Sequence, residues 1–186
     1  MTFAVIILAA GKGTRYGTPK ATAKLNGKRF LRIAADTARD ANIDHIVAVV
    51  SPELETWAQC EFPDCIVTTN PDSSSEMFSS VVCGLTIVPG CDGIFITPVD
   101  HPAIRANTYT MMQNELQQSK ERIVKPQYQQ QTGHPVLLPW SAKQSLLNIS
   151  IETPFNDAVR KLSLPEKYLE VEDPGILRNM NTPDDV

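Results

Sequence analysis

Short apolar runs alternate along this chain with longer stretches in which apolar residues recur at helical spacing. Parallel strands that are covered on both faces appear in a sequence as such near-continuous apolar runs. The predicted strands are residues 3–9, 45–50, 65–69, 93–97, 122–125, 136–138 and 168–171. This alternation predicts a three-layer α/β/α fold with a mostly parallel sheet.

The stretches between the strands predict helices. One apolar helical face is formed by Phe30, Leu31, Ile33, Ala34, Ala35 and Ala38. Asn42 is placed to end that helix. Further helices are predicted from Met77 to Leu85, over residues 109–118 and over residues 155–162, the last with Thr153 as N-cap and Pro154 as first helical residue. With 186 residues, 42% of them hydrophobic, the whole chain (1–186) fits one compact domain.

Several classes of protein are excluded by composition. The longest apolar run, residues 3–10, is far shorter than the roughly 20 residues that cross a bilayer, and no basic residue precedes it as in a secretory signal. We therefore expect a cytoplasmic protein without a membrane partner. Neither a CxxC pair nor a zinc-ligand spacing occurs among the four cysteines, so buried thiols are expected at Cys60, Cys65, Cys83 and Cys91.

Charge is distributed unevenly along the chain. The net charge of −4 argues against a surface that binds nucleic acid. Residues 1–35, however, contain no acidic residue and seven basic ones, namely Lys12, Arg15, Lys20, Lys24, Lys28, Arg29 and Arg32. Because this segment is short and rich in glycine, it favours a polyphosphate group as its ligand.

The loop after the first predicted strand, residues 8–20, reads LAAGKGTRYGTPK. Its glycines allow a tight turn that presents backbone N–H groups to an anion, at the strand end where open α/β sheets bind ligands. A Rossmann G-x-G-x-x-G pattern would need glycine where Tyr16 stands, and the P-loop pattern is also absent. The alternative, a glycine-rich turn that only connects strand to helix, leaves the basic residues unexplained.

This string resembles the L-A-A-G-x-G-x-R-x-G-x-x-K signature of nucleotidyltransferases with a GT-A-like (nucleotide-diphospho-sugar transferase-like) fold. It is most similar to the MobA-like family of molybdenum cofactor cytidylyltransferases and guanylyltransferases. The resemblance implies that Arg15 and Lys20 bind the triphosphate and act in catalysis. It also implies that the nucleotide is lined by Leu8, Ala9, Ala10, Gly11, Gly13 and Thr14.

Asp100 directly follows the strand predicted at residues 93–97, in the string TPVDHP. Its carboxylate should face the same crevice as the glycine loop, and Mg²⁺ binds oxygen ligands from one or two carboxylates plus phosphates. The string resembles the family's D-x-P metal motif, which implies that Asp100 is both catalytic and a metal ligand. A turn aspartate before proline is the alternative. His101, where the family usually has glutamine, is expected to be a solvated loop residue.

Three weaker resemblances follow. Asn70, Ser79 and Ser80 resemble a family segment that approaches the nucleobase. The bulky residues Glu76 and Phe78 depart from the family pattern in this segment. The alternative to a nucleobase contact is a helix that only packs on the sheet. Gly133-His134-Pro135 is similar to a G-H-P segment near the acceptor, where His134 would contact substrate or only bond a neighbouring loop. The tail NMNTPDD resembles the C-terminal motif of the family, which implies that Asn181 is a second metal ligand. The same residues also predict the start of a helix.

Together these features predict Mg²⁺-dependent transfer of a nucleoside monophosphate from an NTP to a phosphorylated small molecule. CTP is preferred, because guanine-using relatives usually have L-A-G-G where this chain has Leu8-Ala9-Ala10-Gly11. The resemblance implies molybdopterin as acceptor and a molybdoenzyme or its chaperone as protein partner. Residues 152–160 depart from the family's G-D-x-G-A-R string, so guanylyl transfer, a sugar- or alcohol-phosphate acceptor and a non-catalytic nucleotide-binding relative stay open.

Overall fold

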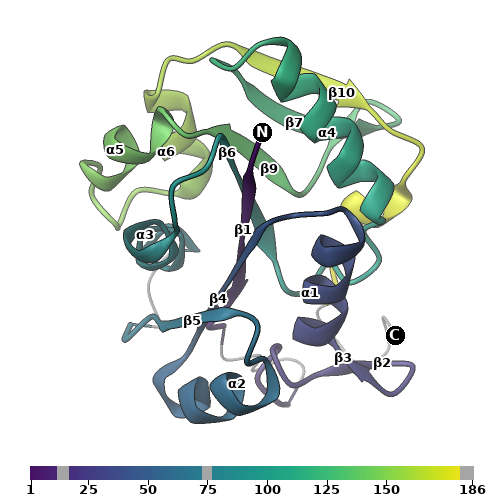
Figure 1. Ribbon diagram of the computed structural model, residues 1–186, viewed down its shortest axis with the longest axis vertical. Coiled ribbons are helices and arrows are strands. Elements are labelled where there is room, and N and C mark those ends of the chain that lie inside the picture. Colours follow the sequence, from purple (N-terminus) through teal and green to yellow (C-terminus); the bar gives the residue numbers. More distant parts are fainter. Residues whose placement is uncertain (12–16, 73–76, 181–186) are drawn as a thin grey trace.

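The computed structural model describes residues 1–11, 17–72 and 77–180. Its central sheet has the strand order β10-β7-β9-β6-β1-β4-β5, with the short β8 paired to β7 (Figure 1). The strands of this sheet are β1 (Phe3–Ala9), β4 (His45–Val50), β5 (Ile66–Thr69), β6 (Gly93–Pro98), β7 (Ile123–Tyr128), β8 (Gln131–Thr132), β9 (Val136–Pro139) and β10 (Glu166–Glu170). A separate hairpin pairs β2 (Lys24–Leu25) with β3 (Lys28–Arg29).

Helices cover both faces of the sheet. They are α1 (Phe30–Asp40), α2 (Glu55–Glu61), α3 (Met77–Ile87), α4 (Ala106–Gln118), α5 (Ala142–Leu147) and α6 (Phe155–Lys161), with short 3₁₀ turns η1 (Pro52–Leu54) and η2 (Pro174–Ile176). In Figure 1, α3, α5 and α6 lie on the left of the sheet and α1 and α4 on its right. None of the helices in the described ranges is both long and apolar enough to span a bilayer.

The alternating side chains of β1 explain the two helix layers. Phe3, Val5, Ile7 and Ala9 pack in one hydrophobic cluster with α1, α2 and α4, whereas Ala4, Ile6 and Leu8 pack in the other with α3, α5 and α6. Successive side chains of a strand point to opposite faces, so a strand that is apolar throughout needs cover on both sides. The predicted three-layer architecture is confirmed.

The direction of β9 distinguishes this sheet from a wholly parallel one. β1 pairs in parallel with β4 and β6, and β10 with β7, but β9 runs antiparallel to both of its neighbours. The start of β9 therefore lies at the edge where β6 and β7 end. This geometry brings the segment that precedes β9 to the carboxyl end of the sheet.

Most predicted elements are confirmed, and a few boundaries differ. Helix α1 ends at Asp40, and Asn42 adopts the left-handed conformation (φ 54°) that follows it. The prediction for α6 was wrong in detail, because Pro154 occupies the N-cap position with extended backbone (ψ 139°) and Thr153 lies outside the helix. Neither α2 nor α5 is predicted by the sequence pattern, because both helices are short and bury few residues. Ala58 is the buried residue of α2, and Ala142 and Leu146 are those of α5.

The expectation of buried thiols was wrong. Cys60 is exposed on α2, while Cys65, Cys83 and Cys91 are partly buried. The reason for Cys60 is its helical position, since Ala58 of the same helix faces the sheet and Cys60 does not. Partial burial raises the pKa of the Cys91 thiol to about 11, so this group stays protonated at neutral pH.

Gly84 allows α3 to approach β1 closely. A Cβ atom at this position would lie 2.4 Å from the Cγ2 atom of Ile6, a fully buried residue. We predict that Gly84→Val lowers the free energy of unfolding by roughly 2–3 kcal/mol, because a well-packed core accommodates added methyl groups poorly. Urea unfolding measures the change. Gly90→Ala, where the added Cβ meets no atom within 4 Å, is the control and should stay near wild type; equal effects of the two substitutions would contradict the prediction.

Candidate active site

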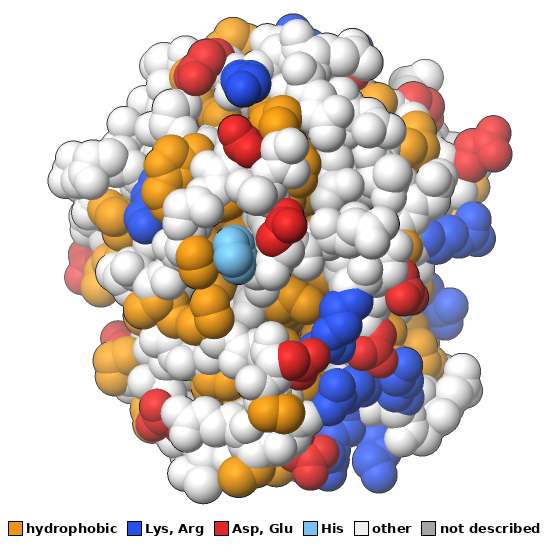
Figure 2. Space-filling model, in the orientation of Figure 1, with side chains coloured by type: hydrophobic (Ala, Val, Ile, Leu, Met, Phe, Trp, Pro, Cys, Tyr) orange, Lys and Arg blue, Asp and Glu red, His pale blue; other side chains and the backbone are white. Residues whose placement is uncertain are grey.

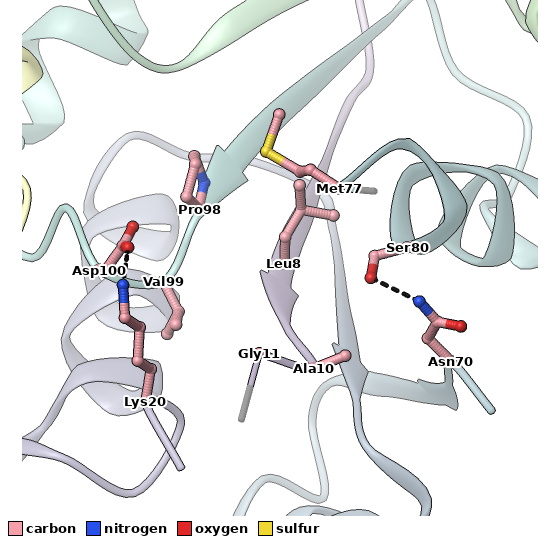
Figure 3. A pocket seen from close by; sticks show the side chains of 10 residues that line it. All are labelled: Leu8, Ala10, Gly11, Lys20, Asn70, Met77, Ser80, Pro98, Val99 and Asp100. Carbon is pink, nitrogen blue, oxygen red and sulfur yellow. Dashed lines mark hydrogen bonds and ion pairs between the residues drawn. The ribbon is translucent and has the colours of Figure 1, made fainter. Parts of the chain in front are cut away.

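A cavity of about 200 Å³ opens at the carboxyl ends of β1, β5 and β6, beside the first turn of α3 (Figure 3). Its lining residues are Leu8, Ala10, Gly11, Lys20, Asn70, Met77, Ser80, Pro98, Val99 and Asp100. Parallel strands end at one edge of the sheet, which explains why residues so distant in sequence line a single cavity.

Lys20 and Asp100 meet on one wall of this cavity. The Nζ atom of Lys20 donates a hydrogen bond to Oδ2 of Asp100, and the two side chains are 19% and 12% exposed. Figure 3 shows Lys20 extending from the loop after β1 toward the carboxylate that follows β6. The sequence prediction that these two residues share a cavity is thus fulfilled by the fold.

The carboxylate of Asp100 is held ionised by its neighbours. Burial by itself would raise its pKa, but hydrogen bonds with His101 and Lys20 and the positive charge of Lys20 outweigh burial and lower it. Nδ1 of His101 lies 3.0 Å from Oδ1 of Asp100. The expectation that His101 is a solvated loop residue was wrong, because its side chain is only 8% exposed and contacts the carboxylate.

The opposite wall carries a fixed amide. The Nδ2 atom of Asn70 donates to the hydroxyl oxygens of Ser79 (2.8 Å) and Ser80 (2.9 Å), and Oδ1 of Asn70 accepts from the backbone N–H of Asp72. Asn70 follows β5 and the serines lie in the first turn of α3, so these hydrogen bonds tie the helix to the strand end. Asn70 and Ser80 line the cavity, whereas Ser79 does not.

Other predicted residues lie elsewhere. The side chain of Ala9 packs in the cluster on the opposite face of the sheet, while its neighbours Leu8 and Ala10 face the cavity. Phe78, on the buried side of α3, is fully buried and stacks on Phe155, so its bulk does not reach the cavity. Outside the described residues lie Gly13, Thr14, Arg15, Glu76 and Asn181.

The chain after β10 returns to the wall of the cavity that carries Asp100. The backbone N–H of Met180 donates to the carbonyl oxygen of Asp100 (2.8 Å), and the Met180 side chain is 1% exposed. Met180 immediately precedes Asn181 in the sequence. The closing motif is visible in the sequence, but only the fold shows that the chain leading to it is anchored at Asp100.

The basic N-terminal segment is divided by the fold. Lys20 reaches the cavity, but Lys24, Lys28, Arg29 and Arg32 surround an outer hollow with Glu61 and Phe62. Figure 2 shows the corresponding group of Lys and Arg side chains at the lower right, over α1 and the β2–β3 hairpin. Lys28 pairs with Asp36 and Arg29 with Glu61, so acidic residues from later in the chain compensate much of this charge. Of the basic residues described, only Lys20 lines the cavity.

His134 lies next to this site but outside the cavity. Its ring centroid is 5.0 Å from that of His101, and its backbone N–H donates to the carbonyl oxygen of Ile176 (3.0 Å). A Cβ atom at Gly133 would lie 2.3 Å from the same carbonyl oxygen, so glycine is needed where this segment passes η2. The peptide bond between His134 and Pro135 is cis.

Asp100 suits a hard cation in combination with phosphate oxygens. Within the described ranges, no three His, Cys, Asp or Glu side chains come together as a set of metal ligands. Mg²⁺, however, is commonly held by one or two carboxylates together with substrate phosphates. An ionised carboxylate on the wall of the cavity fits that mode of binding.

Comparison with known proteins identifies the family. The sequence of residues 5–165 matches the family model of the MobA-like NTP transferase domain. The chain belongs to the MobA-like NTP transferase family. Over 103 residues, 54% of this chain, it is 31% identical to a probable molybdenum cofactor guanylyltransferase from Geobacillus sp. (strain WCH70), and the match spans about half (51%) of that protein.

Solved structures with this fold have low sequence identity to the chain. Rv0371c from Mycobacterium tuberculosis H37Rv is 22% identical, with a TM-score of 0.81 over 100% of this chain and 96% of that one. Its manganese complex aligns with a TM-score of 0.75 at 17% identity over the same shares of both chains. The molybdopterin-guanine dinucleotide biosynthesis protein A of Archaeoglobus fulgidus has a TM-score of 0.72 and 15% identity, over 99% and 94% of the two chains. These likenesses show the nucleotidyltransferase GT-A-like fold.

The burial of His134 makes the stability of this MobA-like protein dependent on pH. Burial and the nearby His101 lower the pKa of His134 to about 4, and Asp100 has a smaller, opposite effect. The Nδ1 atom of His134 has no hydrogen-bond partner among the described residues. On unfolding, the imidazole regains its ordinary pKa of about 6.5 and takes up a proton.

We therefore predict that the free energy of unfolding falls by about 2 kcal/mol between pH 7 and pH 5 because of His134. His134→Phe should flatten this part of the pH dependence, measured by chemical unfolding at each pH. His101→Gln is the control that tests whether the neighbouring imidazole of His101 causes the pH dependence instead. If His134→Phe keeps the wild-type slope, His134 is not the group responsible.

Proposed function

We propose that this protein transfers CMP from CTP to a phosphorylated small molecule, molybdopterin being the acceptor, and releases pyrophosphate with the help of Mg²⁺. The observation that carries the proposal is the meeting of Lys20 and Asp100 in one cavity at the carboxyl ends of β1 and β6. Membership in the MobA-like NTP transferase family supports nucleotidyl transfer as the type of reaction.

The reaction is an in-line displacement at the α-phosphorus of the nucleotide. An oxygen of the acceptor phosphate forms the new phosphorus–oxygen bond, while the bond from the α-phosphorus to the oxygen that bridges to the β-phosphate breaks. Pyrophosphate leaves with the electron pair of that bond. Phosphoryl-type transfers depend mainly on positioning and charge neutralisation, which the residues around the cavity are suited to provide.

Lys20 and Asp100 have distinct tasks in this mechanism. Lys20 exchanges its hydrogen bond with Asp100 for the oxygens of the triphosphate, and so neutralises charge that builds on the leaving group. Arg15, assigned by resemblance, would act beside it. Asp100, joined by Asn181, would hold Mg²⁺, which supplies further charge neutralisation when bound. The chain also keeps Asp100 oriented, since His101 bonds Oδ1 and leaves Oδ2 toward Lys20.

The choice of CTP rests on Ala10. Its side chain lines the cavity and is 3% exposed, and a methyl group there reduces the room for a purine. Guanylyl transfer is the second candidate, favoured by the 31% identity to a probable molybdenum cofactor guanylyltransferase.

The proposal is tested by measuring pyrophosphate release from each of the four NTPs with molybdopterin and with sugar and alcohol phosphates. We expect release with CTP and molybdopterin. Release with GTP alone would overturn the base assignment and support the second candidate. Release with a sugar or alcohol phosphate alone would overturn the acceptor. NTP binding without turnover on any acceptor would indicate a non-catalytic relative.

The base assignment gives a sharper prediction. Ala10→Gly should raise the ratio of kcat/KM for GTP to that for CTP by about tenfold, because one methyl group in a binding pocket discriminates by 10-fold or somewhat more. Steady-state kinetics with both nucleotides measure the ratio. Ala9→Gly is the matched control, since Ala9 packs on the opposite face of the sheet, and it should leave the ratio unchanged. A ratio that changes equally in both variants would contradict the role of Ala10.

Asp100 gives the prediction for catalysis. Asp100→Asn should lower kcat by about 10²- to 10³-fold, a loss typical for removal of one group that stabilises the transition state, while the variant still unfolds cooperatively. Asp40→Asn, a change of the same kind at the exposed end of α1, should keep wild-type kcat. Full activity of folded Asp100→Asn would exclude Asp100 from catalysis.

A further inference from the structure

Asp173 is a buried carboxylate that does not line the active-site cavity. It lies after β10, in the chain that returns to Asp100, and is 3% exposed. Oδ2 of Asp173 accepts from the backbone N–H of Arg105 (2.9 Å) and from the hydroxyl of Thr108 (2.6 Å). Oδ1 accepts from the backbone N–H of Gly175 (2.9 Å). Because burial removes water from a charged group, such donors are what make a buried carboxylate tolerable.

This carboxylate supplies an acceptor that the start of α4 lacks. The N-cap residue of α4 is Arg105, which makes no side-chain cap hydrogen bond, and the first turn of the helix contains no acidic residue. Asp173 accepts the N–H of that N-cap residue, as the acidic side chain of a capping box does, and its negative charge lies at the favourable end of the helix dipole. It does so from 68 residues away in sequence. Figure 1 shows the yellow segment after β10 passing beside α4.

Two short segments connect this helix start with Asp100. The first, the Asp100 loop, is residues 100–105, which lead from Asp100 to Arg105. The second, the return segment, is residues 173–180, and at its end the backbone N–H of Met180 donates to the carbonyl oxygen of Asp100 (2.8 Å). The hydrogen bond between Asp173 and Arg105 joins the other ends of the two segments. Together these two contacts close a ring of chain in which each segment is held at both ends.

The two segments also touch between their ends. A Cβ atom at Gly175 would lie 2.1 Å from the carbonyl oxygen of Ala103, so glycine is needed where the return segment passes the Asp100 loop. The backbone N–H of Arg178 donates to the carbonyl oxygen of Gly175 (3.2 Å), which folds the return segment into a turn. Because closely packed backbone and a hydrogen-bonded turn leave little slack, a displacement at Asp173 should be passed on to Asp100.

We propose that Asp173 is a positioning residue of the active site, which sets the direction of the Asp100 carboxylate by holding the Asp100 loop and the return segment together. The Asp100 loop also carries His101, whose Nδ1 lies 3.0 Å from Oδ1 of Asp100. Opening the ring of chain loosens both the backbone of Asp100 and the imidazole that orients its carboxylate. This inference rests on the proposed function for its effect on catalysis, whereas its effect on the two segments is measurable without substrate.

Amide hydrogen exchange of the full chain without ligands, followed by ¹H–¹⁵N NMR, tests the structural step. Asp173→Asn replaces one acceptor oxygen by an NH₂ group that cannot accept. The amide of Met180 should then exchange about tenfold faster, as expected when local opening no longer breaks a hydrogen bond to a charged group. The amide of Asn70, which donates to Val50 on the opposite wall (2.9 Å), is the internal reference for global stability and should change less. Equal acceleration of both amides would overturn the inference.

Two further variants complete this experiment. Thr108→Val keeps the shape of a buried side chain and removes only the hydroxyl that donates to Asp173. It should speed the exchange of Met180 in the same direction, and it decides the test if Asp173→Asn does not fold. Asp44→Asn is the matched control, because the Asp44 carboxylate also accepts a backbone N–H (Phe3, 2.8 Å), but before β4 at the other end of the sheet. Acceleration of the Met180 amide by Asp44→Asn as large as that by Asp173→Asn would contradict the proposed role.

A double-mutant cycle tests the catalytic step. With an active acceptor, Asp173→Asn should lower kcat by about 10- to 100-fold, because a misplacement of about 1 Å in a catalytic group has effects of this size. In the Asp100→Asn background the same substitution should lower kcat by less than about twofold, since a positioning effect requires the group that is positioned. Equal losses in both backgrounds, or wild-type kcat in Asp173→Asn, would overturn the inference. If wild type releases no pyrophosphate with any acceptor, the proposed function fails, and the exchange of the Met180 amide alone decides whether Asp173 holds the two segments.

Discussion

The ion pair between Lys20 and Asp100 is the contact on which the site depends, because it joins two loops that are separated by 80 residues in sequence. Each loop leaves the end of a strand, β1 or β6, and these strands are direct parallel neighbours in the sheet. The pair lowers the pKa of Asp100 and so keeps an ionised carboxylate on the wall of a partly buried cavity. In the proposed function, the triphosphate and Mg²⁺ would replace this pairing with contacts of higher charge.

The surroundings of the pair are held by further hydrogen bonds. His101 fixes one oxygen of Asp100, and the backbone of Met180 holds the carbonyl group of the same residue. On the other wall, Asn70 ties the end of β5 to the serines of α3. Groups that are prepositioned in this way need little reorganisation when charge develops during the reaction.

The antiparallel strand β9 lies between β6 and β7 and joins them in one sheet. Because β9 begins where β6 ends, the Gly133-His134-Pro135 segment lies beside Asp100 and His101 instead of at the far edge of the sheet. A cavity of about 310 Å³ lies beside this segment, with Lys125 on β7, Tyr168 on β10 and Arg160 on α6 around it. Arg160 belongs to residues 152–160, the part of the sequence that departs from the G-D-x-G-A-R string of the family.

Sequence alone determined the local features: the strands β1 and β4 with their bounds, Asn42 as the residue that stops α1, the glycine loop and its family, and the candidate residues Lys20 and Asp100. These follow from patterns within a few residues, where apolar runs, glycine and proline restrict the backbone. Tertiary structure decided what depends on partners distant in the chain. It set the antiparallel direction of β9, buried His101 against Asp100, turned Ala9 away from the cavity, and paired Lys28 and Arg29 with Asp36 and Glu61. Burial and ion pairing are properties of surroundings that only the folded chain assembles, so no local pattern encodes them.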